Sequence, residues 1–180
     1  MSGYLFLLGA VFSRILPHPW WNFTAVGASL LYFGARRSPR QFFLPVIALA
    51  ATDYYLTVFV YGYPFHLQEY LVTWAWYLGA CFLGWAMLRG QVTADRVVGA
   101  ALTSSTSFFV ISNFAVWMGL GLYPHTLGGL TACYIAGLPF YRNDLLSTTL
   151  LTGAVFGIPV LARRAAEAWQ QHRHSGVMVG

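Results

Sequence analysis

Apolar stretches of the chain alternate with short polar segments, and this pattern predicts an all-α integral membrane protein. Six stretches are rich in hydrophobic residues, and they cover about residues 3–16, 23–35, 41–61, 70–88, 97–122 and 144–161. The third, fourth and fifth are each long enough to cross about 30 Å of hydrocarbon as a helix. We therefore expect a bundle of about six transmembrane helices, with the first stretch short for a full span.

Proline and glycine residues mark the breaks between these stretches. Pro17 and Pro19 end the first one, because proline lacks the backbone donor of a helix and clashes with the preceding turn. A cluster of such residues also interrupts the segment 123–140: Pro124, Gly128, Gly129, Gly137 and Pro139. We expect this segment to be a short interfacial or re-entrant helix, since irregular backbone at membrane depth needs protein or water around it.

The arginines predict the orientation of the chain, because short cytoplasmic loops collect positive charge. They follow the second, fourth and sixth predicted spans: Arg36, Arg37, Arg40, Arg89, Arg96, Arg163 and Arg164. Arg142 lies on the opposite side and does not fit the pattern. We expect a multi-pass protein of the cell inner membrane with both termini in the cytoplasm, in which a transmembrane domain, 1–164, precedes a short cytoplasmic tail, 165–180.

Composition narrows the possible functions. Hydrophobic residues make up 58% of the chain and charged residues 8%, against roughly 25% charged residues in soluble domains. The net charge of +5 lies in short clusters between apolar stretches, so we do not predict nucleic-acid binding. All basic residues are arginine, and a P-loop needs a lysine. ATP hydrolysis would therefore require a separate subunit.

Arg14 and Asp53 are charged residues within apolar stretches. A carboxylate at membrane depth costs several kcal/mol unless it has a partner or faces water. At 1.5 Å per residue, Asp53 lies roughly 18 Å from the cytoplasmic start of its span, and Arg14 roughly 17 Å along the first stretch. We predict that the two side chains pair. The pair either locks two helices together or forms a polar wall of a solute cavity, and both interpretations remain open.

Other polar residues give weaker indications. Asn113 offers hydrogen-bond donors and an acceptor, which suit either a neighbouring helix or a ligand. His18 and His125 have no second histidine or carboxylate at metal-binding spacing, so no metal site is predicted, and any cofactor stays unknown. Gly153 and Gly157 have the spacing of a close helix contact. Clustered carboxylates or histidines at catalytic spacing are lacking, so we do not expect an enzyme.

One family has a similar sequence pattern. The segment from Arg14 to Ala28 contains Arg-Ile-Leu-Pro-His-Pro and then Asn-Phe-Thr. It resembles the opening R-x-x-P-H-P-x-N-F-T-P-x-x-A of an uncharacterised family of bacterial membrane proteins considered to be transport proteins, with an additional tryptophan and Ala25 in place of proline. Residues 113–117, 123–126, 133–134 and 138–143 resemble its second half. In length, span number and orientation, this family is similar to the S components of energy-coupling factor transporters.

That resemblance implies a membrane transport component that captures a small solute, of the vitamin or micronutrient class, from the outer side. The loop between the first two spans would cover the site, and a separate ATPase or transmembrane coupling module, or other membrane subunits, would be partners besides the lipid bilayer. The candidate substrate-binding residues are Arg14, His18, Asn22, Asp53, Asn113, Trp117 and Asn143. The alternative is a structural accessory subunit of a larger respiratory or photosynthetic membrane complex.

Overall fold

The computed structural model describes residues 2–16, 22–90, 92–119 and 121–177, and these form helices and their connections with no strand. The α-helices are α1 (Ser2–Ile15), α2 (Val26–Arg36), α3 (Phe43–Tyr55), α4 (Leu67–Leu88), α5 (Ala94–Gly119) and α6 (Leu127–Val177). A 3-10 turn, η1 (Pro39–Gln41), precedes α3, and a π-helical segment, η2 (Leu56–Val60), continues it. The all-α prediction is confirmed.

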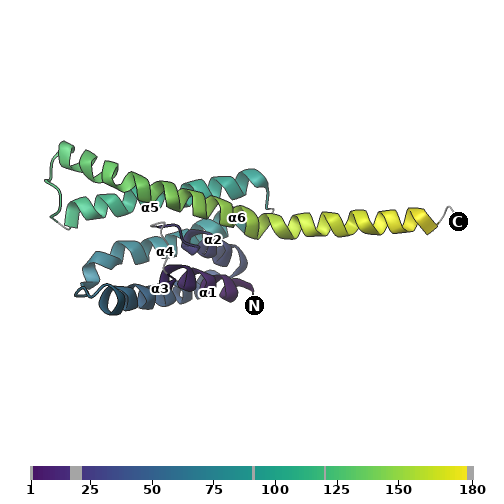
Figure 1. Ribbon diagram of the computed structural model, residues 1–180, viewed down its shortest axis with the longest axis horizontal. Helices are drawn as coiled ribbons and strands as arrows, with labels where there is room; N and C mark the ends of the chain where they lie inside the picture. Colours follow the sequence, from purple (N-terminus) through teal and green to yellow (C-terminus); the bar gives the residue numbers. More distant parts are fainter. Residues whose placement is uncertain (1, 17–21, 91, 120, 178–180) are drawn as a thin grey trace.

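The helices form two layers. The antiparallel pair α5 and α6 lies over α1, α2, α3 and α4, and the C-terminal part of α6 projects beyond both layers (Figure 1). The most extensive contacts join α5 to α6 within one layer and α2 to α4 within the other. Contacts of α4 with α5 and of α2 with α6 hold the two layers together.

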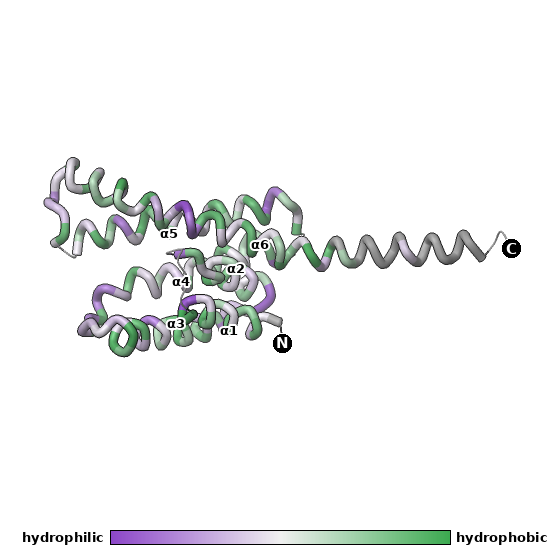
Figure 2. Tube along the Cα trace, in the orientation of Figure 1, coloured by the Kyte–Doolittle hydropathy of each residue, from purple (hydrophilic) through white to green (hydrophobic). Residues whose placement is uncertain are grey.

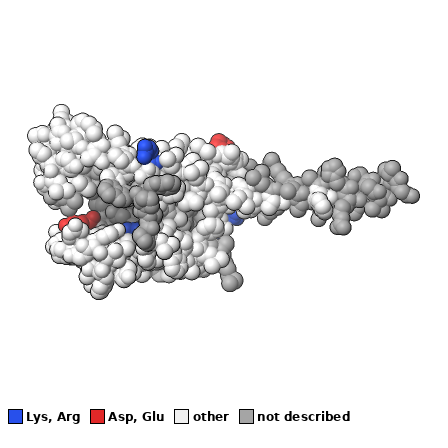
Figure 3. Space-filling model, in the orientation of Figure 1, with Lys and Arg blue, Asp and Glu red and all other residues white. Residues whose placement is uncertain are grey.

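Three segments are long and apolar enough to cross a membrane: Pro39–Val60, Leu67–Leu88 and Ala94–Gly119. Large apolar side chains on the helices remain exposed, such as Ile47 on α3 and Leu150 on α6, which are 60% and 62% exposed. Apolar residues run along most of the trace (Figure 2), and few charged side chains appear on the face in Figure 3. An apolar exterior suits lipid rather than water, and these features indicate a membrane protein.

The second predicted span is instead a buried helix. Helix α2 has 11 residues, about 16 Å of rise, which is too short for the hydrocarbon core. Ten of its residues, from Val26 to Ala35, are buried. An apolar pattern does not distinguish contact with lipid from contact with protein, and here it reflects protein on all sides. Three helices rather than six therefore meet the criteria for a span within the described segments.

The breaks predicted near the C-terminus are absent, because one continuous helix, α6, runs from Leu127 to Val177. The segment 123–140 is not re-entrant, because α6 begins at Leu127 and passes through Pro139 and Pro159 without interruption. The expected span 144–161 and the helical part of the expected tail belong to this same helix. Its glycines allow close packing rather than a break: Gly129 lies against the carbonyl of Pro124, and Gly137 against the side chain of Asn113.

Helices α2 and α4 cross at two glycines. A Cβ atom added to Gly34 would overlap the carbonyl oxygen of Cys81, and one added to Gly84 would overlap that of Leu31. The two backbones therefore touch, which only glycine permits. Gly153 and Gly157 have the spacing that permits a close contact, but no neighbouring atom lies within 4 Å of a Cβ built at either position.

Candidate functional site

The predicted pairing of Arg14 with Asp53 is confirmed. Nη1 of Arg14, at the end of α1, lies 2.6 Å from Oδ1 of Asp53 on α3. The Asp53 side chain is 3% exposed, and the Arg14 side chain is 21% exposed. A buried carboxylate of this kind needs a charged or hydrogen-bonding partner, and α1 supplies it. The ion pair joins the N-terminal helix to a predicted span.

Helix α4 completes a network around this carboxylate. Trp74 Nε1 donates a hydrogen bond of 2.9 Å to Asp53 Oδ2, and the Tyr77 hydroxyl donates one of 3.4 Å to the same oxygen. Arg14 Nη1 in turn donates to the Tyr77 hydroxyl oxygen at 3.0 Å. Sequence reasoning did not assign Trp74 or Tyr77 to the site. The signal was their spacing, because side chains three apart lie on one helix face.

The π-helical segment η2 begins three residues after Asp53. The Tyr61 amide donates to the Leu56 carbonyl at 2.8 Å, a bond that spans five residues. The Thr57 and Tyr70 hydroxyls lie 2.6 Å apart and connect η2 to α4. Such π segments are rare and often occur at functional sites. This one ends the helix that carries the buried carboxylate.

The ion pair faces a cavity of about 250 Å³. Its wall comes from α1, α3, α4 and α5 together with the start of α2, and it includes Arg14, Asn22, Thr24, Val26, Asp53, Glu69, Tyr70, Thr73, Tyr77 and Phe108. We call this the ion-pair cavity. The charged groups therefore contact each other and also line a void.

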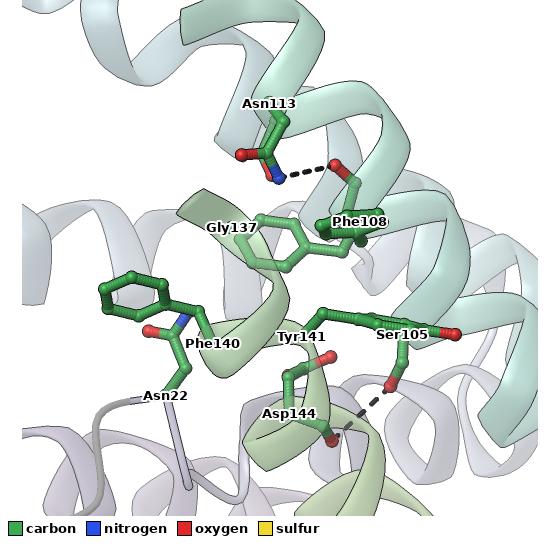
Figure 4. A pocket seen from close by; sticks show the side chains of 10 residues that line it. Asn22, Ser105, Phe108, Asn113, Gly137, Phe140, Tyr141 and Asp144 are labelled. Atoms are coloured by element: carbon green, nitrogen blue, oxygen red, sulfur yellow. Dashed lines mark hydrogen bonds between the residues drawn. The ribbon is translucent and has the colours of Figure 1, made fainter. Parts of the chain in front are cut away.

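A second cavity of about 310 Å³ lies between α5 and α6 (Figure 4). It is lined by Asn22, Ser105, Phe108, Phe109, Ser112, Asn113, Gly137, Phe140, Tyr141 and Asp144, and we call it the aromatic cavity. Asn22 and Phe108 line both cavities, so the two adjoin at the boundary between the helix layers. Asn22 has a φ of 59°, a left-handed conformation that asparagine tolerates better than most residues.

Asn113 contacts a neighbouring helix and also lines a cavity, the two roles that the sequence left open. Its side-chain nitrogen donates to the Phe109 carbonyl of the same helix at 2.8 Å, and its backbone carbonyl accepts from Cys133 Sγ on α6 at 3.3 Å. It also lines the aromatic cavity. The residue therefore helps join α5 to α6 and presents its amide to the void.

The remaining candidates lie elsewhere. Trp117 Nε1 donates to the Pro124 carbonyl at 2.9 Å, and its ring centroid lies 5.3 Å from that of His125, so it fastens the connection between α5 and α6. Asn143 is on α6 and lines neither cavity. His18 lies outside the described residues. Four of the seven predicted residues thus meet at the two cavities: Arg14, Asn22, Asp53 and Asn113.

Sequence reasoning missed Asp144. Its side chain is 8% exposed and lines the aromatic cavity. Within the described ranges, its Oδ2 atom has no hydrogen-bond partner. The Ser105 and Ser147 hydroxyls donate to its main-chain carbonyl, at 3.4 and 3.1 Å. The sequence pattern placed Asp144 at the outer end of a span, whereas it lies within the continuous helix α6.

The described part of the chain brings no three His, Cys, Asp or Glu side chains together in a group that could hold a metal ion. Cys81 and Cys133 are free and buried. The polar lining of the cavities consists of amides, hydroxyls, one guanidinium and separate carboxylates. These groups suit the recognition of a small organic molecule.

A family model matches residues 2–170, nearly the whole chain, and it describes a family of unknown function. No curated protein and no solved structure matches the chain. The geometry of the cavities therefore carries the functional argument.

Proposed function

The chain belongs to DUF6580, a family of unknown function. Because the family gives no function, we propose one from the geometry of the cavities. The protein captures a small solute at the boundary between its two helix layers and serves as the binding component of a membrane transport system. The observation that carries this proposal is the buried Arg14–Asp53 pair, which lines a cavity of about 250 Å³.

The proposal explains why the charged pair faces a void. A pair that only locks helices gains most when both side chains are packed and fully hydrogen-bonded. Here Arg14 keeps 21% exposure, and the ion-pair cavity adjoins the aromatic cavity of about 310 Å³. Together the two voids reach the size of ordinary ligand pockets, roughly 300–1,000 Å³.

The lining also favours entry from one end. Asp53 lies ten residues into α3, about 15 Å along the helix and close to the middle of a bilayer. The ion-pair cavity extends from there to Glu69 and Tyr70, in the first turn of α4. In the proposed orientation this end faces outward, so a solute would enter past the connection between η2 and α4.

The proposed function also includes an arrangement in the membrane and a partner. Both termini lie on the cytoplasmic side of the inner membrane. After the three apolar spans, α6 runs antiparallel to α5 and returns the chain to that side. A separate ATPase module supplies the energy for release of the solute to the inside. The similarity to S components of energy-coupling factor transporters supports this scheme as an analogy of architecture.

Native mass spectrometry of the mildly extracted protein tests solute capture. We expect wild type to retain a small molecule and Asn22→Gly to retain much less, because the change removes an amide from both cavities. Glycine accepts the positive φ of this position, so the backbone is preserved. Leu150→Ala, on an exposed site of α6, is the control and should behave as wild type. A large stable complex without any solute would instead support a structural accessory subunit.

Cysteine labelling tests the orientation. With a membrane-impermeant maleimide, intact cells that carry Tyr63→Cys should react, whereas those that carry Ser38→Cys should react only after permeabilisation. Both positions are exposed, at opposite ends of α3 and η2. The native thiols Cys81 and Cys133 are buried, so the background should be low. Labelling of Ser38→Cys in intact cells would reverse the proposed topology.

A further inference from the structure

We infer that the aromatic cavity binds an organic cation and that the Asp144 carboxylate is its counter-charge. This inference rests on the proposed solute capture and specifies the chemical class of the solute. A ligand that carries an ammonium group, from a primary amine to a quaternary ammonium, fits the lining residues described below.

Asp144 is a buried carboxylate with one unpartnered oxygen. It is 92% buried, and none of the described groups hydrogen-bonds to its Oδ2 atom. Arg14 is already paired with Asp53. Arg142 is exposed, and two residues along an α-helix correspond to about 200° of rotation, so it points away from Asp144. A buried charge costs several kcal/mol without a partner, and a cationic ligand would remove this cost.

Aromatic rings form much of the wall of this cavity. The cavity is lined by Phe108, Phe109, Phe140 and Tyr141. The rings of Phe109 and Tyr141 stack, with centroids 4.6 Å apart and planes 28° apart. Asn22, Phe140, Tyr141 and Asp144 are among the lining residues drawn in Figure 4. Aromatic faces attract cations, most strongly where water is excluded.

Other ligand classes fit this lining less well. An anion would be repelled by Asp144. A bare metal ion prefers several oxygen ligands at short range, and Asp144 is the single carboxylate among the residues that line this cavity. The Asn22 and Asn113 amides can hydrogen-bond to a hydroxyl or amine elsewhere on the ligand. A small organic cation uses the charge, the rings and the amides together.

Calorimetric titration of the full-length protein in nanodiscs tests the inference. The probes are tetramethylammonium, choline and benzyltrimethylammonium, which share the charged group and differ in size. The neutral control is 3,3-dimethyl-1-butanol, which has the shape of choline with carbon in place of nitrogen. We expect at least one cation to bind wild type, and we expect the neutral alcohol to bind much more weakly.

Asp144→Asn should weaken cation binding by about tenfold or more, since it keeps the shape and removes the charge. Asp95→Asn is the matched control, because Asp95 is an exposed acid in the first turn of α5, outside the cavity. It should bind as wild type. Asp144→Asn should also unfold at the same or a higher temperature, because it removes an unpaired buried charge. If that variant does not fold, Phe109→Leu provides a second test and should weaken binding severalfold.

Three results would overturn the inference: no probe cation binds wild type, Asp144→Asn binds as tightly as wild type, or the neutral alcohol binds as tightly as choline. Native mass spectrometry then separates the two proposals. If wild type still retains a solute, only the cationic class is wrong. If it retains none, solute capture is wrong as well.

Discussion

Asp53→Ala should lower the thermal unfolding temperature of the detergent-extracted protein sharply, and Arg14→Ala should lower it by a similar amount. Each change leaves the partner as an uncompensated buried charge, and breaking such a pair typically costs about 3–5 kcal/mol. Asp53→Ala also leaves Trp74 Nε1 and the Tyr77 hydroxyl without their acceptor. Fluorescence-detected thermal unfolding measures both variants directly.

A double-mutant cycle isolates the contribution of the pair. The double variant Arg14→Ala with Asp53→Ala should be clearly less destabilised than the sum of the single changes, since no unpaired charge remains. Glu69→Ala is the control for a carboxylate at the same cavity. It is exposed, so its effect should stay within about 0.5 kcal/mol. A silent Arg14→Ala or Asp53→Ala variant, or strict additivity, would contradict the role of the ion pair.

Gly34→Leu should prevent stable folding, and Gly34→Ala should already lower the unfolding temperature markedly. A single Cβ at this position overlaps the Cys81 carbonyl. This carbonyl belongs to the backbone of α4, so it cannot rotate away as a side chain could. Helices α2 and α4 would have to separate. Overpacking against side chains typically costs about 1–3 kcal/mol, and we expect a larger loss of stability here. Size-exclusion chromatography and thermal unfolding would show the loss.

Gly153→Ala and Gly153→Leu are the matched controls for the helix crossing. Both change a glycine in the interior of α6, where no neighbouring atom lies within 4 Å of the added Cβ. Alanine should stabilise the helix slightly, by up to about 1 kcal/mol. If Gly34→Ala were as stable as Gly153→Ala, the close contact between α2 and α4 would be wrong.

The ion pair could be predicted from sequence because one strong physical rule applies to it. Charge at membrane depth requires a partner, and a constant rise per residue places Arg14 and Asp53 at similar depths. The same rule applies to Asp144, but the expected break before it placed that residue at a membrane boundary. Once α6 is continuous, Asp144 becomes an interior carboxylate of the same kind.

Sequence patterns were less informative where protein takes the place of lipid. Helix α2 is apolar because α1, α4 and α6 surround it, and an apolar stretch of 10–14 residues, about half a span, is typical of a buried helix. The glycines near 129 and 137 resemble helix breaks in sequence, yet they provide room for Pro124 and Asn113. Such contacts depend on which helices are neighbours, and no local pattern contains that information.

Helix α6 connects the cavity to a distant part of the molecule. The helix carries Asp144 at the cavity wall and continues for 33 residues to Val177, a distance of about 50 Å at 1.5 Å per residue. Its distal part projects beyond the two helix layers (Figure 1). A tilt of about 5° centred on Asp144 would therefore displace the far end of the helix by about 4 Å. A small adjustment of the cavity around a solute would thus become a movement large enough for another subunit to detect.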